Sequence, residues 1–564
     1  MAAKRGPLPD PPRSSPAAPR PTGDALDSPG RGSPVELGDV CFHASFVCAL
    51  PGDAGGRAVP REVREAAYSL VNPTPVAAPR LLAWSDDLGT ALGILRPVSL
   101  DGPAAQVLAG NRVLPGMQPY AARYGGHQFG VWARQLGDGR AITLGEIVTG
   151  AGDRFDLQLK GAGPTPYSRR GDGRAVLRSS LREFVCSEAM HHLGVPTTRA
   201  LSLVATGDAV VRDVMYDGHA KAEPGAIVCR VAPSFVRFGN FEILAAQGEP
   251  GLLKSLLDYV IRTHCPTLGE TGPPVYARWF EDVCRSTAVM VAHWMRVGFV
   301  HGVMNTDNMS VHGLTIDYGP YGWIEGFDPM WTPNTTDAAG RRYCFGQQPQ
   351  VALWNLARLA ESLLSLVERD ALEAGLAAYG TAFDDAHRQM FSRKLGLDDL
   401  RDAEDETLLA DLLALLGAVE TDYTIFFRRL AVVPVDDHDA DLDAAACLHA
   451  LDDAFYSDDG RQPEHQGRVL EWLRRYGHCL RKQGIAGSAR KERMRGANPK
   501  YVPRNYLAQL AIDAAEQGDT SVLERLLRVV RRPYDDQPEA EDLAARRPEW
   551  ARHRVGCSAL SCSS

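Results

Sequence analysis

Two oxygen-bearing side chains, Asn308 and Asp317, stand nine residues apart in a segment that could bind a metal ion. Amide and carboxylate oxygens suit Mg²⁺, which takes few protein ligands and completes its shell with phosphate oxygens and water. Asp307, the neighbouring carboxylate, could accept a proton. The alternative is a purely structural role, in which Asp307 and Asn308 only cap a turn. The pair otherwise indicates a magnesium site with an adjacent base.

Several residues earlier in the chain could hold the phosphates that such a metal accompanies. The turn Gly137-Asp138-Gly139-Arg140 could offer backbone N–H groups and a guanidinium, although Asp-Gly usually marks only a hairpin turn. Lys160 could contact phosphates while Glu183, 23 residues further on, holds its amine in an ion pair. Glu183 also has the spacing of a helix capping box after Ser180, a purely structural explanation. Arg230 and Arg237 could both reach an anion.

The elements expected around these residues change character along the chain. Strands are expected over 129–136 and 141–147, joined as a hairpin, then over 155–160, 200–204 and 226–231. A helix is expected to start at Ser180 and to stop at Gly194. Beyond residue 250, helical patterns cover 252–263, 279–297, 352–366, 407–416, 470–475 and 506–530. This α+β order is the one that a kinase-like ATP site requires.

One departure from protein kinases concerns the catalytic segment. His301 to Asn308 has the spacing of the kinase catalytic loop, but Val303 stands where kinases have their base. Ordinary phosphate transfer to a hydroxyl would therefore lack its usual proton acceptor, and Asp307 is the nearest replacement.

Composition excludes several classes of protein. The chain has 564 residues, with 45% hydrophobic and 23% charged residues, so it can bury more than one core. A net charge of −9 lacks the basic excess typical of nucleic-acid binding, and no apolar run is long enough for a membrane span. Eleven cysteines without a C-x-x-C pair indicate neither a disulfide scaffold nor a zinc site. We expect Cys557 and Cys562 to be mobile, exposed tail thiols, and His127, His191 and His192 to be structural.

The assembled motifs resemble those of the selenoprotein O (YdiU) family. They are Tyr124-Gly125-Gly126-His127-Gln128-Phe129-Gly130, Gln135 to Arg140, Leu159-Lys160-Gly161-Ala162-Gly163, Arg174 to Phe184, Asn305-Thr306-Asp307-Asn308 and Asp317-Tyr318-Gly319-Pro320. The resemblance runs from about Tyr68 to the C-terminus.

The resemblance implies a bilobal, protein-kinase-like fold that binds ATP in an inverted pose and transfers AMP to Ser, Thr or Tyr hydroxyls of proteins. It implies Asp307 as proton acceptor, and Asn308 and Asp317 as ligands of Mg²⁺, with Mn²⁺ as an alternative. The nucleotide would be held by Gly137, Gly139, Arg140, Lys160, Asp172, Gly173, Arg230, Arg237 and Asp317, with Glu183 pairing with Lys160. Two other functions stay open: a kinase that transfers the γ-phosphoryl group, and a non-catalytic ATP-binding redox scaffold.

The resemblance also bears on the tail and on cellular location. Cys562 looks like the replacement for a C-terminal selenocysteine. Bacterial relatives can pair a tail cysteine with one after the Asp-Tyr-Gly-Pro motif, where this chain has Pro333, which argues against that disulfide here. Eukaryotic members are mitochondrial, so we predict a mitochondrial location, with the cytoplasm as the alternative.

From these patterns we divide the chain into five parts. The expected parts are a disordered, Pro-rich leader over 1–38, an N-terminal extension over 39–110, an N-lobe over 111–232, a helical C-lobe over 233–435, and a helical extension with a Cys-containing tail over 436–564. The acidic run at 436–443 is expected to be a solvated linker rather than a calcium loop.

Overall fold

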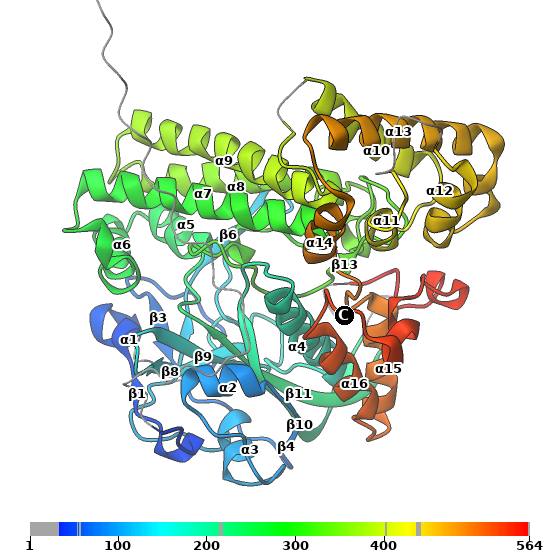
Figure 1. The fold of residues 1–564 in the computed structure, drawn as a ribbon. Coiled ribbons are helices and arrows are strands. Elements are labelled where there is room, and N and C mark those ends of the chain that lie inside the picture. The colour runs from blue at the N-terminus through cyan, green and yellow to red at the C-terminus, as the bar shows by residue number, and fades with distance from the viewer. Residues whose placement is uncertain are drawn as a thin grey trace, which may run out of the picture.

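A computed structural model describes residues 33–561, apart from 54, 56, 57, 214–217, 401, 402 and 436–441. Residues 1–32 of the predicted leader, most of the acidic run and Cys562 lie outside the described residues. The end of the predicted leader is ordered, which corrects its boundary: Val35 bridges to Ile94, and Leu37 is buried in the core of the sheet region. The described part is mixed α+β, with a β-sheet region followed by a mainly helical one, as Figure 1 shows. No helix in the described ranges is both long and apolar enough to cross a membrane.

The main sheet lies in the first half of the chain. Its strand order is β2-β3-β5-β8-β9-β11-β10-β4, and β1 also pairs with β8. The strands are β1 (Phe42–His43), β2 (Gly52–Asp53), β3 (Tyr68–Leu70), β4 (Arg80–Trp84), β5 (Tyr120–Ala122), β8 (Ala141–Val148), β9 (Arg154–Lys160), β10 (Arg199–Arg212) and β11 (Lys221–Ala232). The expected strands at 155–160, 200–204 and 226–231 are confirmed within β9, β10 and β11. Short helices α1 (Ser45–Ala49), α2 (Asp86–Leu92) and α3 (Pro103–Leu108) accompany this part.

The expected hairpin between 129–136 and 141–147 is wrong. Strand β7 (Val131–Gln135) pairs with β6 (Gly125–Gln128), whereas β8 pairs with β9. The chain turns at Phe129 and Gly130, whose φ angles of 50° and 83° are left-handed. Asp138 does not sit on an exposed hairpin turn: it is buried and accepts hydrogen bonds from the Ala122 amide at 3.1 Å and from Gln158 at 3.3 Å. Asp138 is therefore bound by residues distant in the chain instead of forming a local hairpin turn with Gly139.

Helix α4 (Leu177–His192) begins earlier than expected and has no side-chain cap at its N-terminus. The capping box at Ser180 is therefore wrong, and Glu183 lies well inside the helix. The helix ends before Gly194, as predicted. Helix α4 packs against β10 and β11. This packing, rather than a side-chain cap, stabilises the helix.

The second half is helical, as expected. Its helices are α5 (Phe238–Ala246), α6 (Pro250–His264), α7 (Pro273–Val297), α8 (Gln348–Leu363), α9 (Arg369–Leu395), α10 (Ala403–Ala418), α11 (Tyr423–Leu430), α12 (Ala444–Leu451), α13 (Pro463–Lys482) and α14 (Gly487–Ala497). A small sheet, β12 (Phe299–Val300) with β13 (Gly322–Trp323), brackets the segment that carries the candidate catalytic residues. The long helices α7 and α9 lie against each other, as Figure 1 shows. Helix α7 also contacts β12, at the start of this segment.

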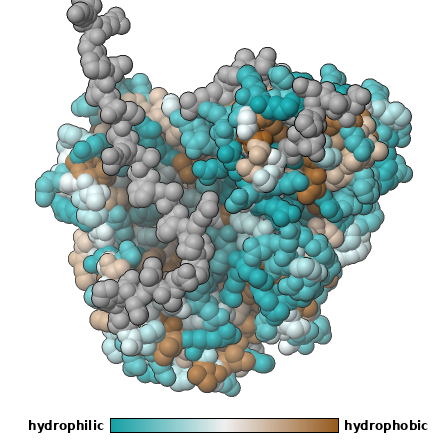
Figure 2. All heavy atoms as spheres, in the orientation of Figure 1, coloured by the Kyte–Doolittle hydropathy of each residue, from teal (hydrophilic) through white to brown (hydrophobic). Residues whose placement is uncertain are grey.

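The C-terminal helices return to the sheet region. The expected helix over 506–530 is two helices, α15 (Asn505–Glu516) and α16 (Ser521–Val530), and both contact α4 (Figure 1). Leu523 and Leu526 pack in one core with Leu181, Phe184 and Leu203. Cys557 is 4% exposed, so the expectation of an exposed thiol is wrong there, because the tail folds back onto this core. Figure 2 shows a mainly hydrophilic face with small, separate hydrophobic patches.

Candidate active site

A buried ion pair joins the sheet to helix α4 at the candidate site. Lys160, the last residue of β9, lies with its Nζ 2.6 Å from a carboxylate oxygen of Glu183. Burial lowers the pKa of Lys160, although Glu183 opposes that effect. The pair expected from the sequence is therefore present. Strand β9 and helix α4 together hold the Lys160 amine at the C-terminal end of the strand.

Asp317 lies within a cluster of cations. Arg230 Nη1 contacts one of its carboxylate oxygens and Arg237 Nη1 contacts the other, while Lys160 Nζ lies 3.7 Å away. Burial alone would raise the pKa of Asp317, but Arg237, Arg230 and Lys160 lower it well below its usual range. Asp317 also has a left-handed φ of 56°, a conformation rarely adopted by residues other than glycine. The carboxylate is thus held ionised in one position.

The two arginines are themselves fixed by further contacts. Arg230 donates to Glu183 at 3.2 Å and contacts Gln158 on β9. Arg237 precedes α5, lies over the Tyr124 ring at 4.6 Å, and donates to the Asp307 carbonyl at 2.9 Å. Arg237 therefore links the turn that carries Asp307 to Asp317.

The turn of Asp307 and Asn308 is a short 3-10 helix, Thr306–Asn308. The Nδ2 of Asn308 donates to the Val303 carbonyl at 3.0 Å, which leaves its amide oxygen available as a ligand. Asp307 is 7% exposed; its Oδ2 accepts from Gln128 at 3.3 Å, and its buried Oδ1 has no hydrogen-bond partner. Burial raises the pKa of Asp307 to about 7, against the opposing effect of Arg237. The plain turn-cap explanation leaves that orphaned oxygen unexplained.

The β6–β7 hairpin covers this turn. The His127 amide donates to Thr306 at 2.7 Å, and a Cβ added at Gly126 would lie 2.7 Å from Asp307 Oδ1. Sequence reasoning missed Gln128 and the hairpin as parts of the site. The Gly125-Gly126 pair was a usable signal, because it permits this close backbone approach.

The predicted phosphate-binding loops meet beside Lys160. The Gly161 amide donates to the Arg140 carbonyl at 2.7 Å, and the Gly163 amide to the Gly173 carbonyl at 3.0 Å. A Cβ at Gly137 or Gly139 would lie within 3 Å of Tyr167, so both glycines permit tight packing under the turn. The side chain of Arg140 is half-buried and makes no hydrogen bond or ion pair with the described residues. Asp172 instead pairs with Arg212 at 2.7 Å on the exposed side of the loop.

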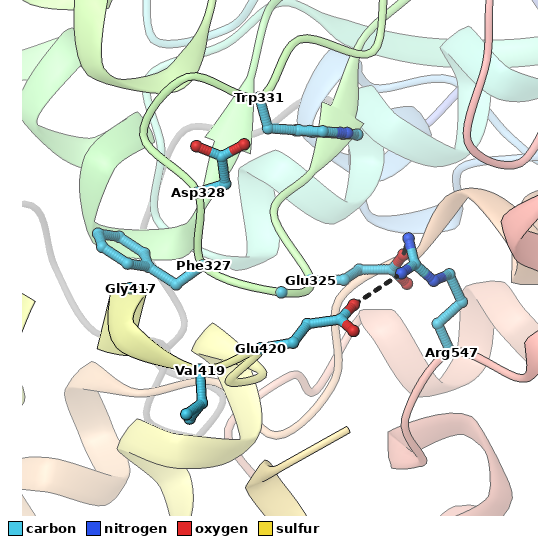
Figure 3. A pocket seen from close by; sticks show the side chains of 9 residues that line it. Glu325, Phe327, Asp328, Trp331, Gly417, Val419, Glu420 and Arg547 are labelled. Atoms are coloured by element: carbon cyan, nitrogen blue, oxygen red, sulfur yellow. Dashed lines mark hydrogen bonds and ion pairs between the residues drawn. The ribbon is translucent and has the colours of Figure 1, made fainter. Parts of the chain in front are cut away.

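Two other features lie outside this site. A cavity of about 310 Å³ is lined by Glu325, Phe327, Trp331 and Arg547, among others, and contains none of the predicted site residues (Figure 3). Within it, Arg547 pairs with Glu325 at 3.1 Å and with Glu420 at 3.2 Å.

The second feature is a group of possible ligand atoms from Asp87, His191 and His192, all within 4.8 Å of one another. Sequence spacing did not reveal it, because Asp87 is distant in the chain. Arg199 forms an ion pair with the Asp87 carboxylate, with a nitrogen–oxygen distance of 2.8 Å. Burial, with help from Arg199, lowers the pKa of His191 to about 4. Because the positive charge of Arg199 already compensates the only carboxylate of this group, a structural role for the two histidines stays our prediction.

Comparison with known proteins identifies the class. The family model described as "Protein adenylyltransferase SelO" matches residues 59–531. A "Protein nucleotidyltransferase YdiU" from Nitrosospira multiformis is 61% identical over 551 residues, covering 94% of this chain and 97% of the relative. The protein of the same name from Azoarcus is 58% identical and covers 93% of this chain and 99% of the relative.

These similarities extend over nearly the whole of both chains. The chain therefore belongs to the SelO/YdiU protein nucleotidyltransferase family, and its enzymatic class is protein adenylyltransferase. The resemblance expected from the motifs is confirmed.

Proposed function

We propose that the chain, with a kinase-like bilobal fold, binds ATP between its sheet and its helical region and transfers AMP to Ser, Thr or Tyr hydroxyls of proteins. The observation that carries this proposal is the connected cluster of Lys160, Glu183, Arg230, Arg237 and Asp317 beside the buried Asp307. The cluster has more cations than carboxylates, which favours a polyanion such as a triphosphate.

The phosphate-holding role falls to two groups of residues. Lys160, Arg230 and Arg237 supply positive charge from the sheet and from the start of α5. Gly137, Gly139 and Arg140, with Asp172 and Gly173, line the adjoining loops. In the structure the two arginines are paired with Asp317. We expect phosphate oxygens to share these guanidinium donors, since each guanidinium offers five N–H groups.

The metal-holding role falls to Asn308 and Asp317. Their oxygens are the hard ligands that Mg²⁺ or Mn²⁺ prefers, and a carboxylate has lone pairs left after binding two arginines. A bound Mg²⁺ supplies charge neutralisation for the triphosphate and the pyrophosphate leaving group.

Asp307 acts as the proton acceptor in this proposal. The acceptor hydroxyl oxygen forms a bond to the α-phosphorus, and the bond from that phosphorus to the oxygen bridging to the β-phosphate breaks. Pyrophosphate leaves with the bond electrons, and the hydroxyl proton passes to the carboxylate of Asp307. Val303, buried in the kinase base position, takes no part in proton transfer. Attack on the α-phosphate in an inverted nucleotide explains why that position needs no base.

The test uses ATP labelled on the α-phosphate with a mixture of acceptor proteins, in Mg²⁺ and in excess EDTA. We expect label on protein only with metal, and its loss in Asp317→Asn. Asp398→Asn is the matched control, because that carboxylate is exposed and pairs only with Arg493 at the surface. Full metal-independent labelling by Asp317→Asn would overturn the metal assignment.

The mitochondrial location remains a prediction, and the two relatives named above are from bacteria.

A further inference from the structure

Two arginines, Arg342 and Arg358, pack on one tryptophan close to the catalytic turn. Arg342 lies against the hairpin tip, because a Cβ added at Gly130 would be 3.4 Å from its Cζ. The next residue, Tyr343, donates from its hydroxyl to Asn305 at 2.7 Å and accepts from the Phe129 amide at 2.9 Å. Arg342 is thus held between the hairpin that covers Asp307 and the segment that bonds the catalytic turn.

Both arginines pack on one aromatic ring. The Cζ of Arg342 lies 4.6 Å, and that of Arg358 4.9 Å, from the centre of the Trp354 ring on α8. Stacking on tryptophan holds a guanidinium plane in place while its terminal N–H groups can still donate. Such a group is prepared for two parallel hydrogen bonds to a carboxylate.

The two arginines differ in their charge partners. Arg358 pairs with Glu361 at 2.7 Å, whereas Arg342 forms no ion pair within the part of the chain that the structure describes. Its Nε is buried without a hydrogen-bond partner. The Asp337 carboxylate accepts from the backbone amides of Arg342 and Tyr343, and the charge of Arg342 partly opposes the rise in the pKa of Asp337 that burial causes. The guanidinium of Arg342 therefore carries a positive charge that has no direct ion pair among the described residues.

The neighbouring surface has the same sign. Arg341 and Arg134 are exposed and have no ion pairs among the described residues. Val131, at the hairpin tip, is 70% exposed. A protein segment whose hydroxyl reaches Asp307 lies near the β6–β7 hairpin that covers this residue, and therefore near Arg342 at the hairpin tip.

We infer that Arg342, stacked on Trp354, recognises an acidic side chain close to the acceptor hydroxyl of the protein substrate. This inference rests on the proposed function and deepens it: the substrate class is a hydroxyl residue in an acidic segment. Arg342 is a specificity-determining residue, and the hairpin tip and Trp354 form the wall against which the segment lies.

The test uses two fluorescein-labelled peptides that differ only in charge, a serine flanked on each side by two glutamates or by two glutamines. Binding to the full chain is followed by fluorescence anisotropy, and AMP transfer by mass. We expect the glutamate peptide to bind about three to ten times more tightly, with the difference shrinking at 0.5 M salt. Arg342→Gln should abolish the preference, and Arg342→Glu should reverse it toward a lysine-flanked peptide.

The controls separate this inference from the proposed function. Arg528→Gln changes an exposed arginine on α16 and should keep the preference. Arg342→Gln should retain ATP binding and AMP transfer to the glutamine peptide. Equal binding of both peptides by the wild type, or an unchanged preference in Arg342→Gln, would overturn the inference while leaving AMP transfer intact. Loss of ATP binding in Arg342→Gln would assign the residue to the nucleotide and also overturn it. Failure of the wild type to transfer AMP to any acceptor would count against the proposed function instead.

Discussion

At the scale of single residues, the site depends on one carboxylate that is shared by several cations. Asp317 contacts Arg230 and Arg237 and lies near Lys160, so its charge is compensated without any ligand. Glu183 gives Lys160 and Arg230 a second partner. Each buried charge therefore has an opposite charge beside it, which is the condition under which buried ions are tolerated.

Removing Glu183 should expose this dependence. Glu183→Gln leaves three cations, Lys160, Arg230 and Arg237, sharing the Asp317 carboxylate, so we expect a loss of about 3 kcal/mol in the free energy of unfolding, measured with urea. Glu361→Gln removes the partner of the half-buried Arg358 and serves as control, with an expected loss below about 1 kcal/mol. Equal stability of Glu183→Gln and wild type would show that the pair contributes nothing.

At the scale of elements, the site depends on how closely the β6–β7 hairpin approaches the catalytic turn. The hairpin is local in sequence, but its partners at Thr306, Asp307 and Tyr343 lie more than 170 residues away. Its position relative to Asp307 thus depends on tertiary packing against α5 as much as on its own turn.

Gly126 makes this approach testable. In Gly126→Ala the new Cβ would lie 2.7 Å from Asp307 Oδ1 and 3.1 Å from the Asp307 backbone N, so the hairpin or the turn must shift. We expect AMP transfer to fall at least tenfold while ATP binding changes little, measured by label transfer and by calorimetry. The control Gly467→Ala adds a Cβ in α13 that meets nothing and should, if anything, stabilise the protein by up to about 1 kcal/mol. Unimpaired transfer in Gly126→Ala would contradict the close approach.

Sequence patterns predicted the elements better than their partners. Periodicity located β9, β10, β11 and the long helices, because those signals lie within one segment. It misplaced the hairpin and the start of α4, because Asp138 and Glu183 are engaged by distant residues rather than by their own turns. Spacing indicated Lys160, Glu183 and Asp317, but the Asp317 clamp by Arg230 and Arg237 follows only from tertiary structure.

A buried histidine pair gives a second prediction at this scale. His264 on α6 and His312 have rings 5.1 Å apart. Burial lowers the pKa of His312 to about 3 and that of His264 to about 4. The folded state thus favours neutral rings. The contribution of the two histidines to the free energy of unfolding is therefore complete above pH 6.5 and is lost as the pH falls from 6.5 towards 3.

The measurement is urea unfolding of wild type and His312→Gln at pH 7 and pH 5. Because the unfolded state takes up the proton first, each histidine should cost the folded state up to about 2 kcal/mol between pH 6.5 and pH 5. His312→Gln should reduce this loss, whereas His553→Gln, at an exposed position, should not. An unchanged pH dependence in His312→Gln would refute the assignment.

At the scale of the whole molecule, the C-terminal region ties the helical part to the sheet part. Helices α15 and α16 pack on α4, while Leu560 pairs with Asn334 in the segment that follows the catalytic residues. The tail therefore reaches Pro333, whose carbonyl accepts a hydrogen bond from the Leu560 amide at 3.0 Å.

Arg504 is the charged link of this arrangement. It lies 2.9 Å from Asp422 and 3.4 Å from Glu325, and all three are buried or nearly so. Arg504→Met removes the cation and keeps a long side chain, so we expect a loss of about 3–5 kcal/mol in the free energy of unfolding. Arg461→Met, which breaks only exposed pairs, should cost less than about 1 kcal/mol. Similar losses for the two variants would contradict the role of the link.

Parallel labelling with α- and γ-labelled ATP tests whether the protein transfers AMP with Asp307 as the base. We expect the wild type to transfer only the α label to protein hydroxyls, and Asp307→Asn to lose at least 100-fold in rate while still binding ATP. Transfer of the γ label would indicate a kinase. Full α transfer by Asp307→Asn would contradict the assigned base.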